Sequence, residues 1–336
     1  MSFLSSSPAP HQHSQRNVAQ MMRDVLLAMF PVSLMLCWTY GWGVLLNILF
    51  AASCCWLLEA AALKIRGRNL QPWLTDGSAP LTGVLLALAL PPLTPWWLIV
   101  IASLFAIVFA KHLYGGLGYN LFNPAMAGYA VLLISFPAYM AWWPDLSAGS
   151  SLNDTLHYFL YGSAAADALS GATPLDALQT GLKQMQTLPE LVANGTLATA
   201  GSAEWVWINL AAIAGGLFLL MRRTITWQIP AGVILGLTLS ALIAWIGDAA
   251  VNPSPWLQLV SGGTMIGVFF IATDPVSSAS TPKGKLIYGA GIGVLTYVIR
   301  TWGAYPDGFA FAVLLMNLAV PLIDRYTRPT LYGQVQ

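Results

Sequence analysis

The sequence predicts an all-α integral membrane protein with about ten transmembrane helices. Of its 336 residues, 57% are hydrophobic and only 8% are charged, whereas a soluble domain carries about 25% charged residues. The apolar residues gather in runs, several of which reach the roughly 20 residues that span a bilayer. The formal net charge is +1. No basic stripe with interleaved aromatic residues is present, so the composition gives no support to nucleic-acid binding.

Ten apolar segments account for the expected spans. They lie at 24–40, 42–63, 79–91, 96–111, 123–141, 206–220, 227–247, 256–272, 286–301 and 307–323. Two of them depart from an ordinary span, because 79–91 is short and ends at a Pro-Pro pair, and 256–272 contains a Gly-Gly pair. Short or Gly/Pro-interrupted spans are typical of the broken helices of transporters.

The basic residues predict the orientation. With the amino terminus inside and ten spans, 12 of the 14 Lys and Arg residues fall on the inner side, and only Lys183 and Arg300 fall outside. The inner ones are Arg16, Arg23, Lys64, Arg66, Arg68, Lys111, Arg222, Arg223, Lys283, Lys285, Arg325 and Arg328. Cytoplasmic segments of membrane proteins carry such an excess of Lys and Arg. We therefore expect both termini to lie in the cytoplasm.

An internal repeat is visible in two of the spans. Residues 82–87 read Thr-Gly-Val-Leu-Leu-Ala, residues 266–271 read Ile-Gly-Val-Phe-Phe-Ile, and Pro91 then aligns with Pro275. Both matches give one offset, since 267 − 83 = 184 and 275 − 91 = 184. Each segment is the third span of a five-span half. An odd number of spans per half inserts the second half upside down, as in inverted-repeat transporters.

The expected organisation has five parts. These are a cytoplasmic tail (1–20), a first five-helix repeat (21–141), a periplasmic loop (142–205), a second five-helix repeat (206–324) and a cytoplasmic tail (325–336). Long loops in compact proteins are usually functional. An inverted repeat also suits a transporter or channel without a redox role, so that function is the alternative to the one developed below.

The loop holds the stretch that carries chemistry. Residues 167–174 read Asp-Ala-Leu-Ser-Gly-Ala-Thr-Pro. Gly171 permits unusual backbone angles and close approach by another molecule. The small side chains of Ser170 and Ala172 leave the hydroxyl of Thr173 unobstructed. A hydroxyl displayed in this way suits modification by an external enzyme.

The proline that follows has a simpler explanation. Pro174 disfavours helical geometry at Thr173 and keeps it extended or in a turn. From the residues alone, an ordinary turn that starts a helix near 175 is the favoured interpretation.

Resemblance to a known pattern changes this interpretation. The stretch from Asp167 to Thr173 resembles the Asp-x-x-Ser/Thr-Gly-Ala-Thr pattern used by the bacterial FMN transferase, which esterifies FMN phosphate to the last Thr. The resemblance implies a covalent FMN phosphoester on Thr173, with Asp167, Ser170, Gly171 and Ala172 as the attachment motif. The transferase works on the outer side, where the loop is expected to lie.

Other stretches carry a resemblance that covers essentially the whole chain. They are Lys-His-Leu-Tyr-Gly-Gly-Leu-Gly at 111–118, Asn-Leu-Phe-Asn-Pro-Ala-Met at 120–126, Phe-Ile-Ala-Thr-Asp-Pro-Val at 270–276 and Tyr-Pro-Asp-Gly at 305–308. They are similar to the D subunits of Rnf electron-transport complexes, called Rsx in some bacteria. The related B subunits of sodium-pumping NADH:quinone reductases share these features but usually carry a longer amino-terminal extension. The Rnf D-subunit family is therefore preferred.

The resemblance implies a role in a membrane complex. Rnf complexes move electrons between NADH and ferredoxin and couple this to sodium or proton movement across the membrane. The implied role is a component of that translocase, which relays electrons through covalent FMN without catalytic residues or a metal site of its own. Its implied partners are the A, B, C, E and G subunits of Rnf, together with the FMN transferase that matures it.

Two asparagines have two compatible interpretations. Asn120 and Asn123 stand at the start of a span, before Pro124. Relatives hold a second, noncovalent flavin such as riboflavin, and neutral amides there suit the edge of an isoalloxazine ring. Alternatively, Asn123 caps the helix, with Pro124 as its first residue.

Four charged side chains near the spans are further candidates. Asp274, and Asp76 as its approximate repeat counterpart, suit an ion path, because carboxylates near membrane depth are costly and often functional. They suit the capping of chain reversals equally well. Glu59 is expected to snorkel from the inner end of the second span. Arg300 suits a flavin phosphate, but pairing with Asp307 is favoured.

The purified chain alone is predicted to oxidise neither NADH nor ferredoxin. It has no Gly-x-Gly-x-x-Gly stretch for a dinucleotide, and Cys37, Cys54 and Cys55 form no Cys-x-x-Cys pair for a cluster. An anaerobic assay with an artificial electron acceptor checks this. Turnover near that of the intact complex would contradict it.

Overall fold

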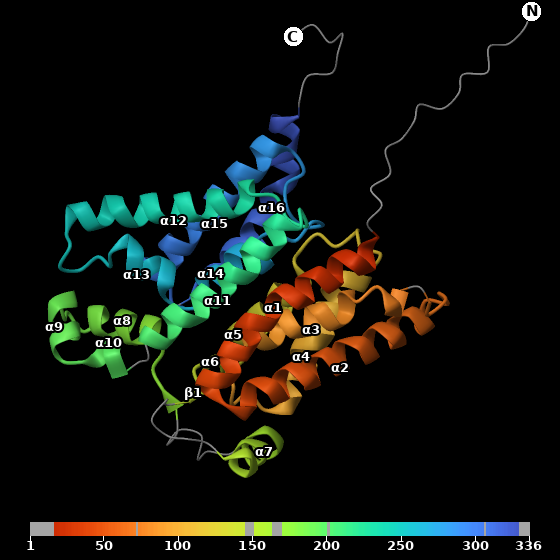
Figure 1. Cartoon of the computed structure of the whole chain (residues 1–336), viewed down its shortest axis with the longest axis horizontal. Helices are drawn as coiled ribbons and strands as arrows, with labels where there is room; N and C mark the ends of the chain where they lie inside the picture. The colour runs from red at the N-terminus through yellow and green to blue at the C-terminus, as the bar shows by residue number, and fades with distance from the viewer. Residues whose placement is uncertain are drawn as a thin grey trace, which may run out of the picture.

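The computed structural model describes residues 17–71, 73–144, 151–162, 170–199, 202–305 and 307–328. Its first half contains α1 (Val18–Tyr40), α2 (Trp42–Ile65), the short 3₁₀ helix η1 (Trp73–Thr75), α3 (Ser78–Ala89), α4 (Trp96–Leu104), which continues as the π-helix η2 (Phe105–His112), α5 (Pro124–Ser135) and α6 (Pro137–Met140). Figure 1 shows these helices packed side by side.

The connecting loop is largely helical. It contains β1 (Trp143–Pro144), α7 (Leu152–Tyr161), β2 (Ser170–Gly171), α8 (Pro174–Lys183), α9 (Leu188–Ala193) and α10 (Thr196–Thr199). The helix expected to start near 175 is present as α8, whereas α7 was not expected. β1 and β2 form a two-stranded antiparallel ladder. Asp167 lies outside the described residues, as does the side chain of Ser170.

The second half contains α11 (Ser202–Met221), α12 (Gln228–Gly247), α13 (Pro255–Val260), α14 (Thr264–Ile266), the π-helix η4 (Gly267–Ile271), α15 (Pro282–Trp302) and α16 (Phe309–Thr327). A helix is thus found at each of the ten predicted apolar segments. Among the described residues, α1, α2, α11, α12 and α16 are long and apolar enough to cross a membrane. The chain is therefore a helical membrane protein, and the number of crossings stays a prediction.

The helices of the two halves recur at nearly one spacing. Adding 184 to the first residues of α1, α2, α3, α4 and α5 gives 202, 226, 262, 280 and 308. The helices α11, α12, α14, α15 and α16 begin at 202, 228, 264, 282 and 309. The same offset of 184 was found from residue identities in one pair of spans. The helix order therefore agrees with a sequence repeat, while the inversion of the second half stays a prediction.

The predicted interruption of the eighth apolar segment is confirmed. α13 ends at Val260 and α14 begins at Thr264. Between them, Gly262 has φ +58°, a left-handed conformation that a side chain would strain. The break divides this segment into two short helices that meet inside the protein.

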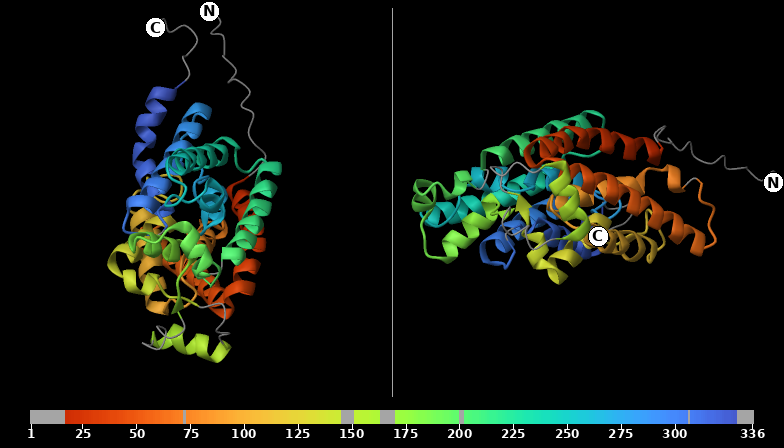
Figure 2. Two further views of the ribbon diagram at one scale, coloured as in Figure 1. Left: turned by 90° about the vertical axis from the view of Figure 1, so that its left-hand side faces the viewer. Right: turned by 90° about the horizontal axis from the view of Figure 1, so that it is seen from below.

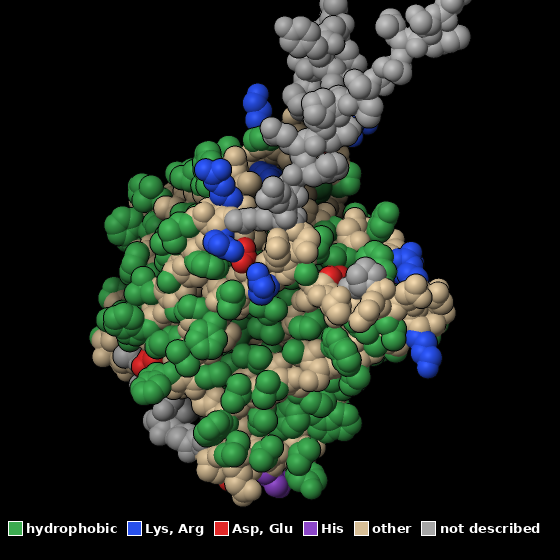
Figure 3. All heavy atoms as spheres, turned by 45° about the vertical axis from the view of Figure 1, so that its right-hand side comes forward, with side chains coloured by type: hydrophobic (Ala, Val, Ile, Leu, Met, Phe, Trp, Pro, Cys, Tyr) green, Lys and Arg blue, Asp and Glu red, His purple; other side chains and the backbone are tan. Residues whose placement is uncertain are grey.

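The two ends of the helix bundle differ in charge. The first and last described helices begin and end at the same side of the molecule, which we call the basic end. Arg222 pairs there with Asp24 near the start of α1. Lys285 lies in the first turn of α15, whose cap Thr281 contacts Thr327 at the end of α16. Figure 3 shows several Lys and Arg side chains gathered there above a largely hydrophobic surface. In Figure 2 (left), α7 lies at the opposite end of the molecule, which we call the loop end.

Glycines allow α12 and α15 to approach closely. A Cβ on Gly236 would lie 2.3 Å from the carbonyl oxygen of Ala290, and one on Gly293 would lie 2.3 Å from that of Val233. Small residues at such contacts are typical of membrane helices, whose association relies on close packing.

Gly293→Val is predicted to destabilise the protein by about 1–3 kcal/mol, the usual cost of overpacking. Its side chain would press on the backbone of α12, which has no room to yield. Thermal unfolding of the detergent-solubilised chain measures the effect. Gly247→Val is the control, because a Cβ on Gly247 meets nothing within 4 Å. Equal unfolding temperatures for the two variants would contradict the prediction.

Candidate functional site

Thr173 is the residue that caps the amino terminus of α8. Its backbone is extended (φ −70°, ψ 160°), and Pro174 is the first helical residue, as predicted. The Thr173 hydroxyl donates a hydrogen bond to Oδ2 of Asp176 at 2.7 Å and accepts one from the Asp176 backbone N–H at 3.3 Å. The turn expected from the sequence is therefore present, and the hydroxyl is held at a helix start.

A short ladder ties the motif to the first half of the chain. Gly171 pairs with Trp143, and Ser170 pairs with Pro144. Trp143 follows α6 closely, so the ladder places the motif beside the loop ends of the first-half helices. Ala172 is exposed to solvent.

Thr173 and Asp176 line a cavity at the loop end, which we call the tether cavity. Its volume is about 440 Å³. This lies within the range of about 300–1,000 Å³ that is usual for ligand pockets. Its aromatic lining residues are Tyr129, Trp143, Trp205, Tyr305 and Phe309. The cavity is thus largely apolar, with a few polar groups near the motif.

The tether cavity is bounded by the break between α13 and α14. Gly262 and Gly263 line it, as does Asp307 just before α16. Nη2 of Arg300 lies 3.1 Å from Oδ1 of Asp307, and the Arg300 side chain is only 2% exposed. The expected pairing of Arg300 with Asp307 is therefore confirmed.

The environment at the cavity wall shifts the pKa of Asp176. Burial raises the pKa of the Asp176 carboxyl above its ordinary value, and the nearby Asp307 carboxylate raises it further. The hydrogen bonds with Thr173 oppose this shift without cancelling it. Asp176 therefore holds a proton more readily than an exposed aspartate does.

Gln179 connects the motif-bearing helix to the second half. From α8, its Nε2 lies 3.2 Å from the carbonyl oxygen of Gly303 and 3.5 Å from those of Arg300 and Tyr305. These carbonyls lie at and after the end of α15, where helical partners run out. The bonds hold α8, and with it Thr173, against the wall of the tether cavity.

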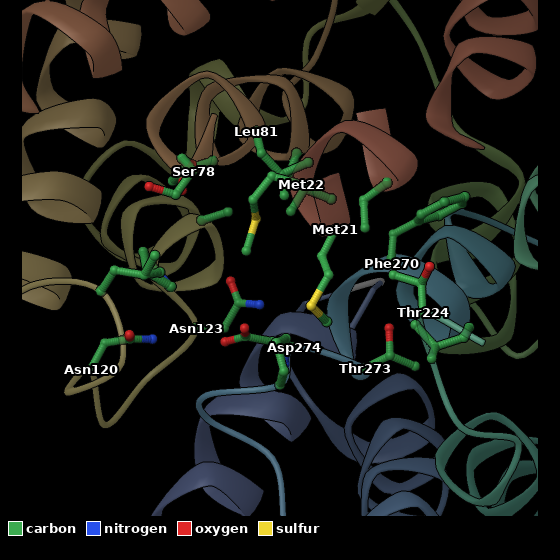
Figure 4. A pocket seen from close by; sticks show the side chains of 18 of the residues that line it. Met21, Met22, Ser78, Leu81, Asn120, Asn123, Thr224, Phe270, Thr273 and Asp274 are labelled. Atoms are coloured by element: carbon green, nitrogen blue, oxygen red, sulfur yellow. The ribbon is translucent and has the colours of Figure 1, made fainter. Parts of the chain in front are cut away.

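A second cavity, at the basic end, brings together several predicted residues. Asn120, Asn123 and Asp274 line it, and its volume is about 90 Å³. Figure 4 shows the Asn123 and Asp274 side chains close together, with Asn120 further along the same wall. Three of the candidate residues predicted from the sequence therefore line the same cavity.

The amide of Asn123 is already in use. Its Oδ1 accepts from the Met126 backbone N–H at 3.2 Å, so the predicted capping of α5 is confirmed. Its Nδ2 donates to the carbonyl oxygen of Ile271 at 3.3 Å. Asn120 donates to Phe122, and its buried Oδ1 has no hydrogen-bond partner among the described residues.

A second flavin does not fit the basic-end cavity in this conformation. Its volume of about 90 Å³ is well below the usual range for ligand pockets. Both polar atoms of the Asn123 amide are already hydrogen-bonded within the protein. No step of the function is therefore assigned to a flavin there, and the second flavin stays a prediction.

Asp274 and Asp76 both cap chain reversals. Oδ2 of Asp274 accepts from the Ser277 hydroxyl at 2.6 Å. Oδ1 of Asp76 accepts from the backbone N–H and the hydroxyl of Ser78, at 2.8 and 2.7 Å. At the helix spacing of 184, Asp274 aligns with Leu90 rather than with Asp76, because 274 − 184 = 90. The capping alternative is confirmed for both, and the ion path stays a prediction.

The sequence matches a known family along nearly its whole length. Residues 5–333 match the NQR2, RnfD, RnfE family. The chain belongs to this family. It is similar to the D subunit of the ion-translocating oxidoreductase complex of Pseudomonas aeruginosa strain LESB58, with 51% identity over 327 residues, 97% of this chain and 94% of the relative. The corresponding D subunit of Aeromonas hydrophila is 47% identical over 340 residues, covering 97% of each chain.

Family membership confirms the resemblance drawn from the motifs. The relatives are named as one component of an ion-translocating oxidoreductase complex. Those relatives are thus subunits of a larger assembly that is named for ion translocation and oxidoreductase activity.

A buried ionic cluster near the basic end corrects one expectation. Oε2 of Glu59 lies 2.6 Å from Nζ of Lys111, and Oε1 lies 3.1 Å from Nε2 of His112. The side chains of Glu59 and Lys111 are 2% and 1% exposed. The expectation that Glu59 snorkels to the surface is therefore wrong. A charge inside a span costs less when it is paired. An ionisable residue within an apolar segment, such as Glu59, therefore indicates that a partner of opposite charge lies nearby.

Lys111→Met is predicted to destabilise the protein by about 3–5 kcal/mol, because it removes the buried ammonium group that balances the Glu59 carboxylate and leaves only His112 beside it. Thermal unfolding in detergent measures the loss. Lys285→Met is the control, since Lys285 is only half-buried and its Nζ donates to the Thr226 hydroxyl at 3.3 Å rather than to a carboxylate. Adding Glu59→Gln to Lys111→Met should recover part of the stability. A Lys111→Met variant as stable as Lys285→Met would contradict the pairing.

Proposed function

We propose that this chain is the D-type membrane component of an Rnf ion-translocating ferredoxin:NAD oxidoreductase, and that it relays electrons through FMN bound covalently to Thr173. One observation carries the proposal. Thr173 is the last residue of a flavin-attachment motif, and it lines an aromatic cavity of about 440 Å³. Motif and cavity are independent features, one of local sequence and the other of the whole fold.

The residues around the cavity fit a flavin. Tyr129, Trp143 and Phe309 offer apolar and aromatic surface for a planar ring system. Thr173 lies at the start of the ten-residue helix α8, where the helix dipole favours a negatively charged phosphodiester. A bound flavin would supply the capacity to accept and release one or two electrons, while the protein positions it and excludes water. Covalent attachment would keep it from being lost to the medium.

The tether cavity lies between the two halves of the chain. Leu88 on α3 and Met126 on α5 line it from the first half, and Ile266 on α14 and Ala310 on α16 line it from the second. A carrier held there would contact both halves. This position supports a relay between partner proteins on different sides of the bundle.

We assign the coupled ion movement to the basic end. Asp274 lines the small cavity there together with Oδ1 of Asn120, which accepts no hydrogen bond from the part of the chain that the structure describes. Asp76 is connected to the same cavity through Ser78. Carboxylates at such depth are costly and often functional. The ion is sodium or a proton. The topology we propose has ten spans in two inverted repeats, cytoplasmic termini and a periplasmic loop in the bacterial inner membrane.

The proposed partners follow from the family. They are the A, B, C, E and G subunits of Rnf, with the FMN transferase acting during maturation. Two other assignments compete with this one. The family also includes NQR2 proteins, which supports a B subunit of a sodium-pumping NADH:quinone reductase. The helix spacing of 184 supports an inverted-repeat transporter without a redox role.

Thr173→Ala is predicted to abolish the covalent flavin, because it removes the hydroxyl to which the phosphate is proposed to be esterified. The measurement is flavin fluorescence of the denatured chain in a gel after co-expression with the FMN transferase. Thr187→Ala is the matched control, since Thr187 caps α9 in the same loop. A wild-type band that stays dark, or a fluorescent Thr173→Ala band, would contradict the assignment.

A further inference from the structure

The hydroxyl of Thr173 is already aimed at a base. Its hydrogen bond to Oδ2 of Asp176 is 2.7 Å long, as expected for a hydroxyl that donates to a carboxylate. The two side chains lie one helical turn apart, and both line the tether cavity. The atom that would be esterified therefore carries its proton directly against a carboxylate.

A second cap in the same loop shows what is particular to Asp176. Ser151 caps α7 and donates to Oδ2 of Asp154 at 2.7 Å, the same local geometry. Ser151 and Asp154 are exposed to solvent. Asp176, by contrast, lines the tether cavity together with Asp307. The hydrogen bond alone is thus an ordinary cap, and the surroundings distinguish Asp176.

We propose that Asp176 is a catalytic residue of flavin attachment, whose carboxylate accepts the Thr173 hydroxyl proton as the phosphoester forms. This inference rests on the proposed function and adds to it a role for the acceptor chain in its own modification. The FMN transferase would then bind and activate the flavin donor, while the acceptor supplies the base.

The step balances with a donor in which the FMN phosphate is held in a pyrophosphate bond to a second nucleotide. Oγ1 of Thr173 forms a bond to the phosphorus of the FMN phosphate. The pyrophosphate P–O bond breaks, and the second nucleotide leaves with the electron pair as its monophosphate. The hydroxyl proton moves to Oδ2 of Asp176. Nothing is oxidised or reduced.

The surroundings of Asp176 suit it to accept the proton and, once protonated, to lie beside the new phosphodiester. A base works best when its pKa is brought toward the working pH, and burial raises the pKa of Asp176 in that direction. Two groups face Asp176. They are the Asp307 carboxylate, which is paired with the Arg300 guanidinium, and the hydroxyl of Tyr129 on α5. After transfer, the protonated Asp176 can donate a hydrogen bond to the phosphodiester instead of repelling it.

The test measures the initial rate of covalent labelling. The full-length chain is purified without the transferase and then incubated with FMN transferase and the flavin dinucleotide donor. Asp176→Gln and Asp176→Glu form the matched pair, because they differ in the basic oxygen but have the same length. Labelling of Asp176→Gln should be slower than wild type by about 10²-fold or more, the usual contribution of a general base. Asp176→Glu should retain most of the rate.

A pH profile separates this role from a structural one. The ratio of wild-type to Asp176→Gln rates should fall as the pH is lowered through the pKa of Asp176, because the wild-type base is then protonated. Asp154→Asn, in the matching cap of α7, should label at the wild-type rate. Equal rates for the Gln and Glu variants, or a ratio that does not change with pH, would overturn the inference.

The same experiment distinguishes this inference from the proposed function. A wild-type chain that takes no label would overturn the covalent flavin itself. If wild type and Asp176→Gln are labelled at the same rate, the covalent flavin stands, but Asp176 takes no part in its attachment.

Discussion

The carbonyl groups released where α13 stops and α14 begins must find hydrogen-bond donors within the protein, because hydrocarbon offers none. Nδ2 of Asn209, on α11, donates to the carbonyl oxygens of Val260 and Gly262, each at 2.8 Å. Nη1 of Arg300, on α15, donates to that of Gln258 at 2.9 Å. The break is thus held by two neighbouring helices. Since the break also forms part of the wall of the tether cavity, these bonds fix the position of that part of the wall.

The loop end depends on the same contacts. Arg300 links the break to Asp307, which in turn accepts from the Phe309 N–H at the start of α16. Gln179 then ties α8 to the end of α15. The hydroxyl of Thr173 is therefore positioned by a continuous series of hydrogen bonds that begins inside the bundle. A surface loop without these bonds would display the same motif without a cavity beside it.

Local signals in the sequence predicted the features that depend on a few neighbouring residues. The Gly-Gly interruption, the capping role of Asn123 and the extended backbone of Thr173 follow from short-range chemistry, and the Arg300–Asp307 pair spans only seven residues. The pairing of Glu59 with Lys111 joins residues 52 apart, and no periodicity in the sequence reveals it. The small volume of the basic-end cavity likewise depends on packing between distant helices.

The central claim is that Thr173 carries FMN through a phosphoester beside the tether cavity. The most direct test is tandem mass spectrometry of the peptide that contains residues 170–183, cut from the chain purified out of its native membrane. We predict a peptide heavier than its sequence by one FMN less one water, with fragments that place the addition on Thr173. An unmodified peptide, or an addition on a different residue such as Ser170 or Thr180, would contradict the claim.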